Sequence, residues 1–521
     1  KAIISLYKTD FNNPPLLNFK DLDSYCNQYA LDFKRQGIQK GTKTIVMIKP
    51  GIDFIAVTFA LFKLGAVPVL IDPGMGTKNM VLCIAEVEPE AFIGIPLAHL
   101  FKAMYRKPFK TIKTSITIKG FNKQPTISRE SHFKEEETTE DEMAAILFTS
   151  GSTGVPKGVV YTHAIFREQV KVIQETYMIE AGEIDLAAFP LFALFGFAMG
   201  MTVIIPDMDP SKPAQVEPEK FVNALMKFNV TGSFGSPAIW RRVVPYCNDK
   251  KIKLNSIKRV LIAGAPVPGE LLKKFREILP ETSETYTPYG CTEALPVSSI
   301  SGNEVCRETL EKTKKGEGIC VGFPLKGVEI KIIKIVDKAI ETIKEVEFLE
   351  QGTIGEIMVK GGVVTPRYYN RDASTQLAKI KEGDTVWHRI GDVGYFDSKK
   401  RLWFVGRKNH RVEISPEITL FSIQVEALFN NHPDVFRSAL VGVGAIPNQT
   451  PVMIIEPVKK GFMSAKEKKK IVKELRILLN SSSRNFEIKH ILFYSSFPVD
   501  VRHNAKINRE QLAIWAEKKV G

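Results

Sequence analysis

A buried strand that runs directly into a glycine-rich loop is the feature that most constrains how this chain can fold. Residues 143–148 are all apolar, and residues 149–158 read TSGSTGVPKG. Glycines let the backbone approach phosphate oxygens closely, hydroxyls add hydrogen-bond donors, and Lys157 adds a positive charge. The run lacks the Gly-Lys-Ser/Thr ending of a Walker A loop. A merely flexible loop would not need this density of hydroxyls, so the run predicts a phosphate-binding loop of another type.

The segments around this loop predict parallel α/β structure in the first half of the chain. Residues 44–48 and 67–71 are candidate strands, and they flank a candidate helix at 54–64. Such alternation is typical of a parallel sheet covered by helices. Farther along, short β runs at 330–336 and 354–359 predict a small antiparallel unit.

The last part of the chain predicts a separate α+β region. Ser464 and Glu467 have the spacing of a capping box, and the apolar residues that follow recur at helical spacing. Lysines at 466, 468, 469, 470 and 473 would lie on the wet side of that helix. Contact with a membrane surface through this face stays open as an alternative, although solvation alone explains the lysines.

Length and composition are those of an ordinary globular protein with several folding units. With 521 residues the chain exceeds one hydrophobic core, and roughly two to four units are expected. The net charge of +14 suits acidic partners such as nucleotides, but there is no basic cluster with interleaved aromatics, so nucleic-acid binding is not expected. The six cysteines are scattered without a CxxC pair, which predicts reduced thiols and a cytoplasmic protein. Residue 1 is a lysine, so the presence of an N-terminal segment before it, including a signal sequence, stays an open alternative.

One apolar stretch is nearly long enough to cross a bilayer. Residues 186–205 carry no charge, but Pro190, Gly196 and Gly200 interrupt them. We therefore expect a buried loop, helix and strand, and no transmembrane segment.

Five further motifs follow the phosphate loop in a fixed order. They are Ala263-Gly264-Ala265-Pro266, Tyr289-Gly290-Cys291-Thr292-Glu293, Gly391-Asp392, Gly406-Arg407 and Ala505-Lys506-Ile507-Asn508-Arg509. Together with the loop they resemble the adenylate-forming superfamily, which contains acyl-CoA synthetases, peptide-synthetase adenylation domains and firefly luciferase. The resemblance covers nearly the whole chain. Considered singly, a residue such as Glu293 or Asp392 would more often be a surface or capping carboxylate, and the ordered set carries the inference.

The resemblance implies an ATP site. The phosphate loop would contribute Thr149, Ser150, Gly151, Ser152, Thr153, Gly154 and Lys157. The next two motifs would supply the adenine and α-phosphate contacts, with Gly264, Ala265 and Pro266 along the adenine, Tyr289 stacked on it beside Gly290, and Thr292 and Glu293 at the α-phosphate. Glu293 would also hold Mg²⁺. Asp392 would bind the ribose hydroxyls and Arg407 the ribose and phosphate, and Lys506 would bridge the acyl and phosphate oxygens.

These roles imply an ATP-dependent, AMP-forming ligase. A carboxylate resists nucleophilic attack because of its charge, and joining it to AMP turns it into an activated mixed anhydride with release of pyrophosphate. Such a step asks the protein mainly for positioning and charge neutralisation. Catalysis would therefore rest on Lys506, Glu293, Thr292 and Lys157.

The acid is expected to be aliphatic or aromatic. Residues 189–197 stand where the family begins its acyl pocket, and they contain four phenylalanines and no charge. An amino-acid substrate would need a carboxylate for its ammonium group, and this run has none. The expected acyl-pocket residues are Phe189, Phe192, Phe195, Phe197 and Cys291.

Several longer stretches look like one branch of the superfamily, the β-lactone synthetases of long-chain olefin biosynthesis, which are often labelled fatty acyl-CoA ligases. They include residues 62–76, 189–200, 205–210 and 498–507. In that branch a β-hydroxyl of the activated acid attacks its own acyl adenylate and gives a β-lactone and AMP. The unusual hinge residues Asn409-His410 and the sequence Ser415-Pro416-Glu417 fit a chain that builds no thiol site.

Two alternatives remain at this stage. A fatty acyl-CoA ligase would pass the acyl group to CoA, so CoA is a cofactor only under that reading. A non-catalytic nucleotide-binding protein is the other alternative, and the intact motifs count against it. By resemblance, assembly with other olefin-pathway enzymes is a further expectation.

The resemblance also implies the architecture. We expect an α/β fold with a large N-terminal domain over residues 1–405, made of two α/β subdomains and a small β-barrel. A smaller, mobile α+β domain would follow over residues 406–521 and carry the catalytic lysine.

Overall fold

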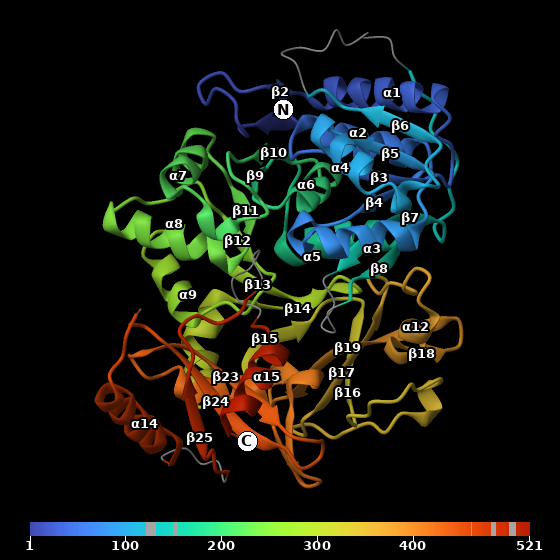
Figure 1. Ribbon diagram of the computed structural model, residues 1–521. Coiled ribbons are helices and arrows are strands. Elements are labelled where there is room, and N and C mark those ends of the chain that lie inside the picture. Colours follow the sequence, from blue (N-terminus) through green and yellow to red (C-terminus); the bar gives the residue numbers. More distant parts are fainter. Residues whose placement is uncertain (121–131, 150–154, 460, 481–485, 500–506, 521) are drawn as a thin grey trace.

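The structure is a computed structural model that describes residues 1–120, 132–149, 155–459, 461–480, 486–499 and 507–520. Figure 1 shows two α/β units side by side, a strand-rich region next to them and a smaller C-terminal unit adjoining that region. The expected α/β fold with a large N-terminal part and a smaller C-terminal part is confirmed.

The first subdomain is built on a six-stranded sheet. Its strands run in the order β6 (Thr114–Thr117), β5 (Ala91–Gly94), β3 (Lys43–Met47), β4 (Val67–Leu70), β7 (Met143–Thr149) and β8 (Lys157–Thr162). The first five are parallel, and helices α2 (Ile52–Lys63), α3 (Thr77–Val87) and α4 (Pro96–Met104) connect β3, β4, β5 and β6 in turn. Helix α1 (Phe19–Arg35) precedes β3. Strand β8 pairs antiparallel with β7, and this hairpin holds both ends of the predicted phosphate loop.

The second subdomain continues the α/β pattern. Parallel strands β1 (Ile3–Ser5), β10 (Thr202–Ile205), β9 (Ile184–Ala187), β11 (Gly232–Gly235), β12 (Arg259–Ile262) and β13 (Glu284–Cys291) lie side by side, with β2 (Leu16–Leu17) antiparallel at the edge. Its helices are α5 (His163–Tyr177), α6 (Pro190–Ala198), α7 (Pro218–Lys227), α8 (Pro237–Asp249) and α9 (Gly269–Arg276).

The same sheet then turns antiparallel. Strands β14 (Ala294–Ser301), β15 (Ile319–Pro324), β20 (Leu402–Arg407), β19 (Thr385–Phe396), β17 (Gly355–Gly361) and β16 (Val328–Ile333) follow one another, and β18 (Lys379–Glu382) pairs with β19. Short helices α10 (Gly302–Glu304), α11 (Leu310–Lys314) and α12 (Asp372–Ala378) connect them. The expected small β unit is therefore an antiparallel run that is continuous with the second subdomain.

The C-terminal unit has the expected α+β composition. It contains the hairpin β21 (Val412–Ser415) and β22 (Ile418–Leu420) and the sheet of β23 (Val435–Val443), β24 (Thr450–Pro457) and β25 (His490–Phe493). Its helices are α13 (Ser422–Phe429), α14 (Ala465–Asn480) and α15 (Arg509–Val520). The capping box before α14 is confirmed, since Ser464 N donates to Glu467 Oε2 at 2.7 Å and Glu467 N donates to Ser464 Oγ at 3.2 Å.

The apolar stretch at 186–205 folds as expected into the end of β9, helix α6 and strand β10, all within the second subdomain. In the described ranges, none of the helices is both long and apolar enough to cross a membrane.

Candidate active site

A large cavity opens where the two α/β subdomains, the antiparallel strands and the C-terminal unit meet. Its volume is about 2220 Å³, larger than the roughly 300–1,000 Å³ of a typical small-molecule site. Residues from nearly every predicted motif line it, including Lys157, Gly264, Tyr289, Asp392 and Arg407. The cavity is therefore the common location of motifs that are widely separated in the sequence.

Asp392 forms the centre of the first polar group in this cavity. It lies on β19, directly opposite Arg407 of β20, and the carboxylate accepts an ion-pair contact from Arg407 Nε at 3.0 Å. Tyr289 of β13 donates its hydroxyl to Asp392 Oδ2 at 2.7 Å. Burial, and then the Asp392 carboxylate, raise the pKa of Tyr289 well above its usual value, and Asp392 also raises the pKa of Arg407. The two partners of Asp392 thus come from different strands, Arg407 from β20, which pairs directly with β19, and Tyr289 from β13, which lies farther along the sheet.

Glu293 lies at a tight turn that connects two antiparallel strands. Cys291 of β13 pairs with Ala294 of β14, so Thr292 and Glu293 occupy the turn between them. Gly290 is required just before this turn, because a Cβ there would lie 2.5 Å from the Ala294 carbonyl oxygen. The turn places the Glu293 side chain at the edge of the cavity.

Two residues outside the predicted motifs hold Glu293 in place. Tyr368 donates its hydroxyl to Glu293 Oε1 at 2.7 Å. The backbone N–H of Thr365 donates to the Glu293 carbonyl oxygen at 2.9 Å, and the Thr365 hydroxyl donates to the same oxygen at 3.0 Å. Lys157 Nζ lies 4.9 Å from the centre of the Tyr368 ring. The predicted lysine and glutamate are therefore connected through one tyrosine.

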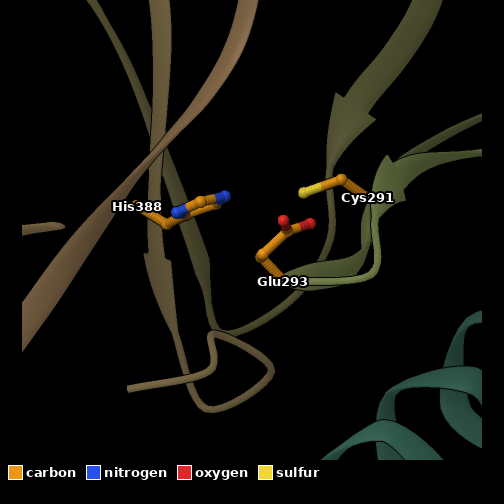
Figure 2. A group of neighbouring side chains, drawn as sticks. All are labelled: Cys291, Glu293 and His388. Carbon is orange, nitrogen blue, oxygen red and sulfur yellow. The ribbon is translucent and has the colours of Figure 1, made fainter. Parts of the chain in front are cut away.

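Figure 2 shows Cys291, Glu293 and His388 pointing toward one another, with one potential ligand atom of each lying within 4.8 Å of the others. Burial raises the pKa of the Cys291 thiol well above its usual value and lowers the pKa of His388 well below its usual value. Near neutral pH the thiol and imidazole are therefore uncharged, and Glu293 alone of these three offers a hard anionic oxygen. That donor fits Mg²⁺, which typically uses one or two carboxylates together with phosphate oxygens.

A buried lysine lies behind this group. Lys379 of β18 is 6% exposed, and its ammonium donates to the Thr365 carbonyl oxygen. Burial lowers the pKa of Lys379 to about 8, while nearby Glu293 acts in the opposite direction. This positive charge disfavours a second cation bound through the sulfur and imidazole of Cys291 and His388.

The segment predicted to lie along adenine follows β12 and reaches the cavity. Gly264 has φ of +90°, a left-handed conformation that glycine adopts without a steric penalty. Ala265 and Pro266 line the cavity beside it. Tyr289, whose ring the resemblance places on adenine, lines the same cavity.

The predicted acyl residues divide into two groups. Phe189, Phe192 and Phe195 line the cavity, and Phe192 stacks on Phe234 with ring centres 3.9 Å apart. Phe197 is absent from the described lining residues, is 7% exposed and belongs to the buried core that includes Val203 and Ala193. Two residues along a helix rotate a side chain by about 200°, so Phe197 faces the core while Phe195 faces the cavity.

The C-terminal motif also reaches the cavity. Ile507, Asn508 and Arg509 line it, and Arg509 Nη2 contacts Glu426 Oε2 at 2.7 Å. Lys506, residues 150–154 of the phosphate loop and the side chain of Thr149 lie outside the described residues.

Sequence reasoning did not identify Thr365, Tyr368, Lys379 and His388. They lie between the third and fourth motifs in sequence, and a lone tyrosine or lysine there carries no recognisable pattern. His388 stands four residues before Asp392 on β19, but the pairing of that strand with β17 shifts register between Arg389 and Val393, so the spacing alone could not place the two side chains together.

Comparisons with known proteins agree with this geometry. The AMP-binding enzyme family matches residues 9–369. The chain is 42% identical to an olefin beta-lactone synthetase of Xanthomonas campestris pv. campestris, over 96% of this chain and 91% of that protein. It is also 42% identical to an olefin beta-lactone synthetase of Stenotrophomonas maltophilia, over 97% of this chain and 92% of that protein.

A solved structure with the same fold is the amide bond synthetase McbA from Marinactinospora thermotolerans. It superimposes with a TM-score of 0.79 at 20% identity, over 99% of this chain and 96% of the other. The family match covers well over half of the chain and contains the loop, turn and strand motifs that meet in the cavity, although Asp392 and Arg407 lie beyond it. This chain belongs to the AMP-binding enzyme family.

Proposed function

We propose that this enzyme activates a long-chain 3-hydroxy carboxylic acid with ATP and closes it to a β-lactone. The observation that carries the proposal is the 42% identity to olefin beta-lactone synthetases along 96% of the chain. It is supported by a cavity that joins a polar end, built on Glu293 and Asp392, to a phenylalanine-rich end.

In the first step a carboxylate oxygen of the acid attacks the α-phosphorus of ATP, and pyrophosphate leaves. Asp392 would accept hydrogen bonds from the ribose hydroxyls, and Arg407 and Lys157 would offset phosphate charge. Lys506 would add a point charge where the acid meets phosphorus. Glu293 would hold Mg²⁺, which neutralises charge on the phosphates when bound.

In the second step the 3-hydroxyl oxygen attacks the activated carbonyl carbon. The bond between that carbon and the AMP oxygen breaks, the hydroxyl proton is lost, and a four-membered lactone and AMP result. The attack is intramolecular, so holding the hydroxyl against the carbonyl supplies much of the rate. Cys291 and the phenylalanines of the acyl side would position the chain for this geometry.

We also propose that the chain divides into residues 1–405 and 406–521, with the second part moving against the first. The large sheet ends with β20 at Arg407, and β21 begins a separate hairpin at Val412. The site would then be closed by residues from both parts, since Asn508 and Tyr289 line one cavity.

The test is a product analysis of purified enzyme with MgATP and a long-chain 2-alkyl-3-hydroxy acid, with and without CoA. An ordinary fatty acid of matched length serves as the control substrate. The proposal predicts a β-lactone and AMP without CoA from the hydroxy acid. An acyl-CoA that forms only when the thiol is present would replace the lactone function with that of a fatty acyl-CoA ligase.

A further inference from the structure

The cavity has a deep end that none of the predicted motifs reaches. Asp185 of β9 lines it, and it pairs with Gly232 of β11, which in turn pairs with Arg259 of β12. On the same strands, Gly235 and Ile262 lie three residues farther toward the predicted adenine segment. At a rise of about 3.3 Å per residue, Asp185 therefore lies about 10 Å deeper than that row.

The surroundings of Asp185 are mostly apolar. This end of the cavity is lined by residues of α5 and the connection after it, of the α6–β10 connection and of β12, namely Ile173, Tyr177, Ile179, Met199, Met201 and Leu261. Gly232 leaves the carboxyl open to this space, because a Cβ at that position would lie 3.7 Å from Asp185 Oδ1 and 3.9 Å from Met201 Cε. An acidic side chain thus stands at the end of a channel suited to an alkyl chain.

Neighbouring charges do not pair with this carboxyl. Arg259 is 8% exposed, and its guanidinium is occupied by both carboxylate oxygens of Glu183 and by the Met178 carbonyl oxygen. Over the described residues, neither a hydrogen bond nor an ion pair is formed by the Asp185 side chain. Burial raises the pKa of Asp185 to about 7, so below that pH the group is a neutral acid that can donate and accept hydrogen bonds.

The Asp185 side chain is half-buried and faces the cavity, where water can bind it. Covering such a polar group without giving it a hydrogen-bond partner is costly. A methyl-terminated chain that reached Asp185 would expel that water without replacing its hydrogen bonds. A chain with a hydroxyl or carbonyl group at the same depth would replace them. The deep end therefore favours acyl chains that are too short to reach Asp185, or longer chains that carry a polar group at that depth.

We propose that Asp185 forms a polar subsite at the deep end of the acyl channel. The subsite binds a hydroxyl or carbonyl group far along the acyl chain. When no such group is present, it holds water, and this water limits the length of plain alkyl chains that fit the channel. The proposal rests on the proposed function, because it names the acyl substrate that the adenylation site would accept.

The test compares wild-type enzyme with Asp185→Ala and Asp185→Asn. The substrates are 3-hydroxy acids of increasing chain length, each with and without a terminal hydroxyl, and the measurement is kcat/KM for pyrophosphate release. For wild-type enzyme, kcat/KM should fall once plain alkyl chains are long enough to reach the subsite. For those chains, kcat/KM of Asp185→Ala should be about tenfold higher than that of wild type. At that length the preference for the terminal hydroxyl should drop by about tenfold in Asp185→Ala. Asp185→Asn, which keeps size and hydrogen bonding, should retain the wild-type profile.

A second variant keeps the test independent of how Asp185→Ala folds. Gly232→Ala adds one methyl group beside the carboxyl and should shift the length limit to shorter chains while leaving the KM for ATP unchanged. The same length profile and the same hydroxyl preference in wild type, Asp185→Ala and Gly232→Ala would overturn the subsite. Failure of wild-type enzyme to release pyrophosphate with any of the acids would instead overturn the adenylation function, and the subsite with it.

Discussion

The two ends of the cavity treat carboxylates in opposite ways. At the polar end, Asp392 faces Arg407 at 3.0 Å and the Tyr289 hydroxyl at 2.7 Å, and Glu293 accepts from the Tyr368 hydroxyl at 2.7 Å. At the deep end, Asp185 lies among apolar side chains while the neighbouring Arg259 is committed to Glu183. Both ends belong to one continuous cavity.

This difference separates two functions of the same chemical group. A carboxylate with cationic and hydrogen-bonding partners stays ionised and can hold a cation or the hydroxyls of a sugar. A carboxyl that lies in apolar surroundings without such partners becomes a neutral acid. It then forms hydrogen bonds with a polar group of the substrate and none with a methyl group. Under the two proposals above, charge at the first end would serve the reaction, and a neutral carboxyl at the second end would serve substrate selection.

The largest effect should come from removing the lysine predicted to act at the polar end. Lys506→Ala should lower kcat for pyrophosphate release by about 100- to 1,000-fold, because a charge that stabilises the transition state is lost. ATP binding should remain measurable by calorimetry. Lys466→Ala, which removes an exposed lysine from α14, is the control and should turn over normally. Undiminished turnover in Lys506→Ala would remove this lysine from the mechanism.

Replacing an aspartate by asparagine at each end of the cavity tests the difference between the polar end and the deep end directly. Asp392→Asn should raise the KM for ATP by about 10- to 100-fold, since it weakens charge-assisted hydrogen bonds. Asp185→Asn should leave the KM for ATP unchanged, since that carboxyl lies about 10 Å deeper than the row of Gly235 and Ile262 next to the predicted adenine segment. Equal changes in the two variants, measured by steady-state kinetics with ATP varied, would contradict the division of the cavity.

A smaller effect should follow from loosening Glu293. Tyr368→Phe removes the hydroxyl that donates to the Glu293 side chain and should lower kcat about tenfold, with a higher Mg²⁺ requirement. Tyr161→Phe is the matched control, because its hydroxyl donates to the backbone carbonyl of Thr292 and leaves the Glu293 carboxylate untouched. If Mg²⁺ titrations of the two variants superimposed, the hydrogen bond to Glu293 would have no catalytic role.

The smallest effect should be a pH-dependent change in stability. The pKa of Asp185 is raised from 3.8 to about 7, so between these values the folded protein binds more protons than the unfolded chain. Its contribution to the free energy of unfolding therefore falls as pH rises through this window. Asp185→Asn lacks that contribution, so its Tm relative to wild type should rise by roughly a few degrees from about pH 4 to about pH 7. A Tm difference that stays constant with pH would show that Asp185 does not titrate in this range.

Most of the fold and of the polar end could be predicted from the sequence. Strands such as β3 and β7 are short apolar runs with clear boundaries, and Ser464 with Glu467 marks the start of α14 through local hydrogen bonds. Asp392, Arg407 and Tyr289 occur in short contiguous motifs, and the resemblance of the ordered motifs to the adenylate-forming superfamily implied a shared site. The structure adds that they contact one another.

The remaining features depend on tertiary packing. Phe197 has the same chemistry as Phe195, and only the orientation of α6 decides which of them faces the core. Tyr368 reaches Glu293 across 75 residues of sequence. In the sequence, Asp185 resembles an ordinary polar residue of a strand. Its position in an apolar part of the cavity depends on Gly232 and Met201, and the sequence does not show that these residues lie near it.

The most direct test of the proposed chemistry follows oxygen atoms through the reaction. The enzyme would receive MgATP and a 2-alkyl-3-hydroxy acid labelled with ¹⁸O either in the carboxylate or in the 3-hydroxyl, and AMP and lactone would be analysed by mass spectrometry. Activation of the carboxylate predicts that AMP carries one ¹⁸O from the labelled carboxylate, and that ¹⁸O from the hydroxyl stays in the lactone ring. Hydroxyl-derived ¹⁸O in AMP would contradict the account, because the enzyme would then activate the alcohol and not the acid.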